Sequence, residues 1–186
     1  MRHIETEHER VVASEPGPGA RGAVSAQERL QKALDLAYAY INPRDRTVNE
    51  VRQRLQRQGV SEEVTDTAIR TLAEQGFLDD DRFTRLFVAD KRALEQWGSE
   101  RIRRGLLSRG IDRHLADAAL AEEPAAAGEE EEPESELDRA IALLRRRFPE
   151  PPEDRRERNR ALGMLLRKGY ETELALDALA AYARGD

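Results

Sequence analysis

The 186-residue sequence has no cysteine, few aromatic residues and no long apolar run. Without cysteine the chain cannot form disulfides, a thiolate zinc site or a cysteine nucleophile, which suits a reducing compartment. Aromatic residues make up 5% and hydrophobic residues 39% of the chain. So little apolar surface is hard to arrange into one large core, and small units stacked side by side bury it better.

The sequence also shows no segment with the features of a membrane-spanning helix or of a signal peptide. No apolar run approaches the ~18 residues of a membrane-spanning helix. Residues 1–13 carry charges where a signal peptide has its apolar stretch. We therefore expect a soluble cytoplasmic protein with no membrane partner.

Residues for catalysis are scarce. His3 and His8 lie near the N-terminus and His114 stands alone, which argues against a metal cluster or a histidine-based triad. The run Asp79 to Asp81 is the best carboxylate cluster, but it has no histidine or cysteine nearby and is better explained as a helix cap. We expect no enzyme, no catalytic residue, no metal site and no cofactor.

One local pattern occurs three times, around Gly59, Gly110 and Gly169. A glycine just past a helix adopts the left-handed conformation that satisfies the last carbonyl groups, and a polar residue soon after it starts the next helix. The pattern therefore predicts a joint between two helices. In each copy a leucine precedes the glycine by four residues, and an apolar and then a polar residue follow it: Leu55, Val60 and Ser61; Leu106, Ile111 and Asp112; Leu165, Tyr170 and Glu171.

Apolar residues at helical spacing complete each repeat as a set of three helices. Capping boxes at Ser25–Glu28 and Thr47–Glu50 start two helices of the first repeat. We expect an all-α fold, a tandem array of three three-helix repeats with nine helices, elongated and with room for curvature. The expected segments are a disordered tail at 1–24, repeat 1 at 25–78, repeat 2 at 79–122, an acidic linker at 123–135 and repeat 3 at 136–186.

The formal net charge of -6 is unevenly distributed. Residues 122–136 carry eight glutamates and no base, whereas residues 26–120 have 17 bases against 16 acids and residues 137–186 have 11 against 9. The helical segments are therefore slightly basic.

Basic residues concentrate in the second helix of each repeat, and acidic residues in the third. One interpretation is that charges complement the helix dipoles and form weak surface ion pairs between neighbouring helices. The other is a basic stripe for phosphates or for an acidic protein surface. The arginines of this candidate binding stripe are Arg52, Arg54, Arg57, Arg101, Arg103, Arg104, Arg109, Arg155, Arg156 and Arg158.

The aromatic residues Phe77, Phe83, Phe87 and Trp97 follow helical spacing. Aromatic rings also stack on bases, but this spacing favours packing in the core.

Four blocks of the sequence form a recognisable pattern: Arg46-Thr47-x-x-Glu50-Val51-x-x-x-Leu55-x-x-x-Gly59-Val60, Leu72-x-x-x-Gly76-Phe77-Leu78-Asp79-Asp80-x-Arg82-Phe83, Trp97-Gly98-x-x-x-Ile102-x-x-x-Leu106-x-x-x-Gly110-Ile111 and Leu165-Leu-Arg-Lys-Gly-Tyr170. With these blocks the sequence resembles the bacterial RecX regulatory proteins. The resemblance spans about residues 30–182, and the tail and the acidic linker depart from the usual form of the family.

The resemblance implies a non-enzymatic regulator of homologous recombination and the SOS response. Such a protein binds the RecA recombinase filament within its groove on single-stranded DNA and restrains ATP hydrolysis, strand exchange and LexA cleavage. The arginine pattern leaves open a helical-repeat module that binds single- or double-stranded DNA without RecA, or a scaffold for another acidic protein. We expect a monomer.

The periodicity places Leu106 in the core of the second repeat. Leu106→Ala should lower the free energy of unfolding by ~2 to 5 kcal/mol, because it removes buried methyl groups and leaves a cavity. Chemical denaturation measures this loss, and an unchanged unfolding midpoint would place Leu106 on the surface.

Overall fold

The computed structural model describes residues 25–122 and 135–185, so the expected tail and nearly all of the expected linker lie outside it. Ser135, counted with the linker on sequence, is the N-cap of the seventh helix. The described residues form nine α-helices and no strand, as predicted. The helices are α1 Ala26–Ile41, α2 Val48–Arg57, α3 Glu62–Glu74, α4 Asp80–Ala93, α5 Ser99–Leu107, α6 Arg113–Ala121, α7 Glu136–Arg147, α8 Arg155–Lys168 and α9 Thr172–Arg184.

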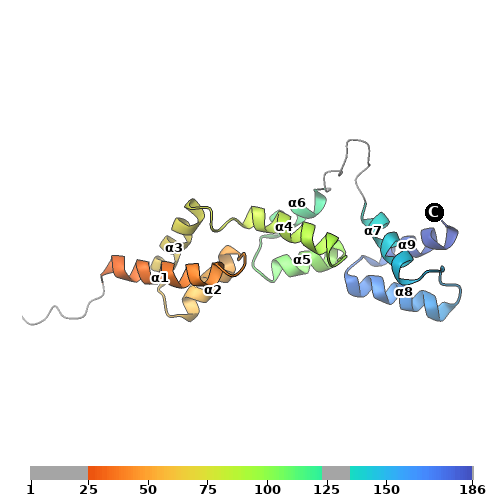
Figure 1. Ribbon diagram of the computed structural model, residues 1–186, viewed down its shortest axis with the longest axis horizontal. Helices are drawn as coiled ribbons and strands as arrows, with labels where there is room; N and C mark the ends of the chain where they lie inside the picture. The colour runs from red at the N-terminus through yellow and green to blue at the C-terminus, as the bar shows by residue number, and fades with distance from the viewer. Residues whose placement is uncertain (1–24, 123–134, 186) are drawn as a thin grey trace, which may run out of the picture.

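The helices form three consecutive three-helix repeats arranged in a row (Figure 1). Helices α1 to α3, α4 to α6 and α7 to α9 each enclose a separate hydrophobic core. Leu106 is fully buried in the middle core, as the periodicity predicted. The elongated tandem array of three-helix repeats predicted from the sequence is therefore confirmed.

Each repeat turns from its second to its third helix at the predicted glycine. Gly59, Gly110 and Gly169 have φ angles of 77°, 80° and 92°, in the left-handed region that favours glycine. In all three repeats the N–H after the glycine donates to the carbonyl oxygen of the leucine four residues before it, at 3.2 Å. This bond closes the helix end and brings two apolar side chains together, which explains why the three residue types recur as a unit.

Repeats 2 and 3 are joined where the start of α5 meets the end of α8. The N–H groups of Gly98 and Glu100 donate to the carbonyl oxygens of Lys168 and Gly169, at 2.9 and 3.1 Å. First-turn amides and last-turn carbonyls have no partner within their own helices, so the contact satisfies both ends and aligns the two helix dipoles. A Cβ atom on Gly98 would lie 2.5 Å from the Gly169 backbone, so the close approach requires glycine.

Repeats 1 and 2 are joined in the same way, at the start of α2 and the end of α5. The Thr47 hydroxyl and the Asn49 side-chain amide donate to the carbonyl oxygen of Arg109, at 2.7 and 3.3 Å. Thr47 is fully buried, and this bond pairs its hydroxyl. A Cβ atom on Gly110 would lie 2.3 Å from the Asn49 side chain. Both joints therefore place a second helix end to end with the next one.

A carboxylate from the following repeat reinforces each joint. Asp80, at the start of α4, accepts the N–H of Val48 in α2 at 2.9 Å. Glu136, at the start of α7, accepts the N–H of Ser99 in α5 at 2.7 Å. Burial raises the pKa of Asp80, and the Val48 hydrogen bond opposes that rise. Asp80 is thus a joint residue, and its neighbour Asp79 is the expected cap of α4, accepting the Arg82 N–H at 2.9 Å.

The two outer ends of the row differ from the joints. A Cβ atom on Gly59 would meet no atom within 4 Å. Helix α8 begins one turn early: its N-cap Asp154 precedes Gly169 by 15 residues, whereas Thr47 and Gly98 precede their glycines by 12. Helix α8 is therefore longer at its start than α2 and α5, the second helices whose starts dock at the two joints.

Alanine at a joint glycine should separate the repeats. Gly59→Ala should cost about 1 to 2 kcal/mol, because it strains only the left-handed backbone. Gly169→Ala should cost more and loosen the row, because its Cβ atom would lie 2.3 Å from the Cβ atom of Arg101. Chemical denaturation and small-angle X-ray scattering measure both effects. Equal stabilities and equal scattering profiles for the two variants would contradict the proposed joint.

Candidate functional site

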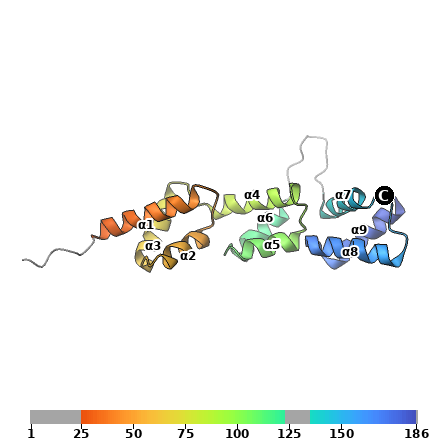
Figure 2. The ribbon, with the colours of Figure 1, turned by 60° about the horizontal axis from the view of Figure 1, so that its bottom comes forward.

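The second helices of the three repeats follow one long edge of the molecule. Figure 2 shows α2, α5 and α8 along its lower side, below α1, α4 and α7. Set end to end, helices of 10, 9 and 14 residues span roughly 50 Å at about 1.5 Å per residue. We call this surface the second-helix edge. All ten arginines of the predicted stripe belong to these helices or to the residues that end them.

Two of the ten arginines fasten a second helix to its own third helix. Arg52 contacts Asp66 at 2.5 Å, and Arg103 contacts Asp117 at 2.6 Å. Both arginines stand seven residues before the glycine of their repeat, and both partners stand seven residues after it. For these two residues the structure shows the exchange of ion pairs between neighbouring helices that was one of the two interpretations of the charge pattern.

Repeat 3 has two leucines in place of this ion pair. Leu162 and Leu176 occupy the positions seven residues before and after Gly169. Leu162 packs against the core of repeat 3, whereas Leu176 is 49% exposed. The corresponding surface of repeat 3 is therefore partly apolar.

Two other arginines hold neighbouring repeats together. Arg101 donates from Nη1 to the carbonyl oxygen of Arg167 in repeat 3, at 2.9 Å. The Nε atom of Arg109 lies 4.0 Å from a carboxylate oxygen of Glu50 in repeat 1. Arg101 and Arg109 therefore contribute to the joints.

The remaining arginines are more available to a partner. Arg158 donates to the carbonyl oxygen of Pro152 at 3.3 Å, and Arg54 is half-buried with its guanidinium 5.7 Å from the Tyr40 ring. The first turn of α8 has no counterpart in α2 or α5. It holds the exposed residues Arg155 and Arg156, whose distances from the repeat glycine match those of no arginine within α2 or α5. In all, five of the ten are exposed and form no ion pair with the described residues: Arg57, Arg104, Arg155, Arg156 and Arg158.

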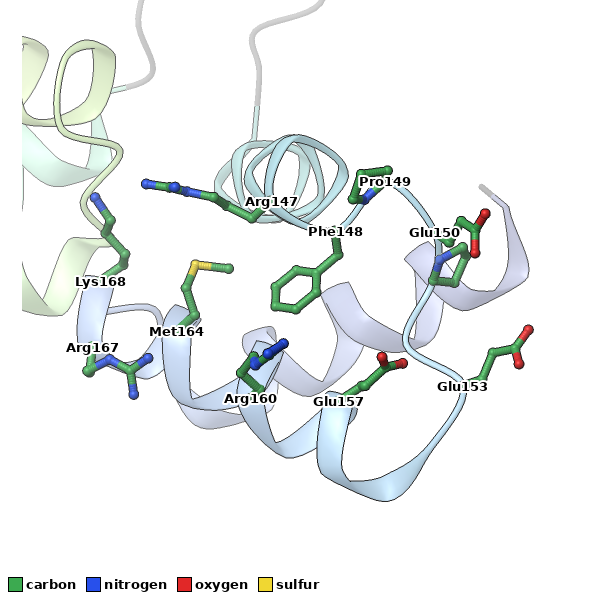
Figure 3. Close-up of a pocket in the computed structure, with 11 residues that line it drawn as sticks. Arg147, Phe148, Pro149, Glu150, Glu153, Glu157, Arg160, Met164, Arg167 and Lys168 are labelled. Atoms are coloured by element: carbon green, nitrogen blue, oxygen red, sulfur yellow. The ribbon is translucent and has the colours of Figure 1, made fainter.

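A groove of about 860 Å³ lies in repeat 3 between the end of α7 and α8 (Figure 3). Phe148 and Met164 provide its apolar part, Lys168 lies toward repeat 2, and Glu150 and Glu153 lie at the far end (Figure 3). Arg147 is not among the arginines predicted from the sequence, because that prediction considered only second helices and Arg147 is the last residue of α7, a first helix. The charged lining residues are Arg147, Arg160, Arg167, Lys168, Glu150, Glu153 and Glu157.

The described residues hold no group of three or more histidine or acidic side chains placed to bind a metal ion. No helix in residues 25–122 or 135–185 combines the length and the apolar character needed to cross a membrane.

The Arg103 ion pair gives a measurable electrostatic signature. The hydrogen bond from Arg103 lowers the pKa of the Asp117 carboxyl. A lowered folded-state pKa stabilises the fold at neutral pH, and this contribution is lost as the pH falls through that pKa. In Arg103→Gln the pKa of Asp117 should rise toward its ordinary value of about 3.9, which a carboxyl carbon NMR titration measures. Arg104→Gln is the control, and an Asp117 pKa that stayed low in Arg103→Gln would exclude the ion pair.

Comparison with known proteins follows the same division into repeats. Residues 33–72 match the first three-helix domain of RecX, residues 79–120 the second and residues 134–179 the third. Two solved structures share the fold: RecX from Lactobacillus salivarius, with a TM-score of 0.68 and 19% identity over 84% of this chain and 97% of that one, and a regulatory protein RecX, with a TM-score of 0.63 and 20% identity over 86% and 73%.

Sequence relatives carry the same name. Regulatory protein RecX of Amycolatopsis mediterranei is 31% identical over 80% of this chain and 82% of its own, and that of Mycobacterium sp. strain JLS is 28% identical over 93% and 92%. The protein of Lactobacillus delbrueckii is 37% identical, but the match covers 51% of this chain and only 35% of that longer protein. The three matched domains and the relative from Amycolatopsis show that this chain belongs to the RecX family.

Proposed function

We propose that this protein is a non-enzymatic regulator that binds the RecA filament on single-stranded DNA and restrains its ATP hydrolysis, strand exchange and coprotease activity. Family membership supports the class of partner. The observation that carries the proposal is the second-helix edge, which extends roughly 50 Å because two joints place α2, α5 and α8 end to end.

A long edge on a row of packed repeats suits a repetitive partner. A protein that contacts two neighbouring subunits of a filament at once binds one relative arrangement of those subunits more tightly than other arrangements. It therefore opposes any step of the ATP cycle that changes this arrangement. The exposed arginines Arg57 and Arg104, on α2 and α5, supply cations at two separated points of the edge.

Inhibition of single-strand-dependent ATP hydrolysis by the cognate RecA tests the proposal. The wild-type protein should slow hydrolysis, and the double variant Arg57→Glu/Arg104→Glu should lose most of this effect with unchanged helicity. These residues are chosen because reversal of Arg101 or Arg103 would also break a joint or an ion pair.

The matched control is Arg70→Glu/Arg146→Glu, which makes the same change of charge at exposed residues of α3 and α7. It should inhibit like the wild type. Folded wild-type protein without effect at several-fold excess over RecA would refute the regulatory function. Equal loss of inhibition in both double variants would show that only the overall charge matters.

A further inference from the structure

A second pocket, of about 430 Å³, lies where repeats 2 and 3 meet on the second-helix edge. We call it the seam pocket. No carboxylate lines it, and Arg104 and Arg167 have no ion pair with the described residues. Its lining residues are Trp97, Arg101, Arg104, Gly105, Ser108 and Arg167.

The seam pocket contains a platform formed by one aromatic ring and one cation. The guanidinium of Arg101 lies over the Trp97 ring, 4.2 Å from its centroid, and a hydrogen bond to the Arg167 carbonyl holds it there. Gly105 keeps access open, because a Cβ atom at this position would already lie 3.8 Å from the indole and 3.2 Å from the Phe87 ring. An indole ring with a guanidinium held over it offers an aromatic and cationic surface to a ligand.

We propose that the seam pocket binds one nucleotide of a single-stranded nucleic acid. Arg104 and Arg167 contact the backbone phosphates, and the base stacks on the Arg101–Trp97 platform. The volume lies within the range of small-ligand sites. An acidic peptide would use the cations but has no ring for the platform, and a duplex keeps its bases stacked inside, so a single strand fits both features.

Trp97 is the only tryptophan of the chain, so its fluorescence reports on the seam pocket alone. A short oligothymidylate should quench this fluorescence saturably at low salt, because a base comes to lie against the platform. An abasic deoxyribose phosphate oligomer of equal length should bind at least about fivefold more weakly and leave the fluorescence unchanged, because it retains the phosphates but lacks the base.

Arg104→Gln and Arg70→Gln form a pair of variants that each remove one positive charge from an exposed arginine. Arg104 lines the seam pocket, whereas Arg70 lies on α3, outside the pocket and outside the second-helix edge. Arg104→Gln should weaken oligothymidylate binding and reduce the slope of log affinity against log salt by about 0.7, the loss of one phosphate contact to a single strand. Arg70→Gln should change neither quantity.

Three results would overturn this inference: no quenching by oligothymidylate, equal quenching by polyglutamate, or equal weakening of binding by Arg104→Gln and Arg70→Gln. It does not rest on the proposed function, because the experiment contains no RecA. A negative result for oligothymidylate binding therefore leaves the result on RecA ATP hydrolysis unaffected. A negative result on ATP hydrolysis likewise leaves the binding result unaffected.

Discussion

The architecture depends on one type of contact, in which the last carbonyl groups of one second helix accept hydrogen bonds from the start of the second helix in the preceding repeat. Lys168 and Gly169 accept from Gly98 and Glu100, and Arg109 accepts from the Thr47 side chain. Because helix ends carry unpaired backbone groups, this contact satisfies groups that would otherwise need water. It also converts three separate cores into one row with a continuous edge.

Much of this fold could be predicted because its determinants are local in sequence. The hydrogen bond from the Val60 N–H to the Leu55 carbonyl oxygen spans five residues, and the same bond recurs in the other two repeats. The joints could not be predicted, because they bring together residues about 60 to 70 positions apart, such as Thr47 with Arg109 and Arg101 with Arg167. The fixed spacing of a repeat does not encode such contacts.

The candidate site was predicted at the level of helices rather than of side chains. Placing the arginines on second helices was enough to locate the edge, but not to separate their roles. Arg52 and Arg103 pair within their repeats, Arg101 and Arg109 join repeats, and Arg57 and Arg104 are left exposed. Partners on other helices decide these roles. The same packing buries one side of Trp97 against Arg101 and so creates the seam pocket.

The proposed function requires the joints between the repeats, and not the repeats alone. The measurement that tests this requirement is inhibition of RecA ATP hydrolysis by Gly169→Ala beside Gly59→Ala at equal concentration. Both variants place alanine in a left-handed position, but only Gly169 faces a neighbouring repeat. Gly59→Ala should inhibit like the wild type, and Gly169→Ala should inhibit far less. Full inhibition by folded Gly169→Ala would contradict this requirement.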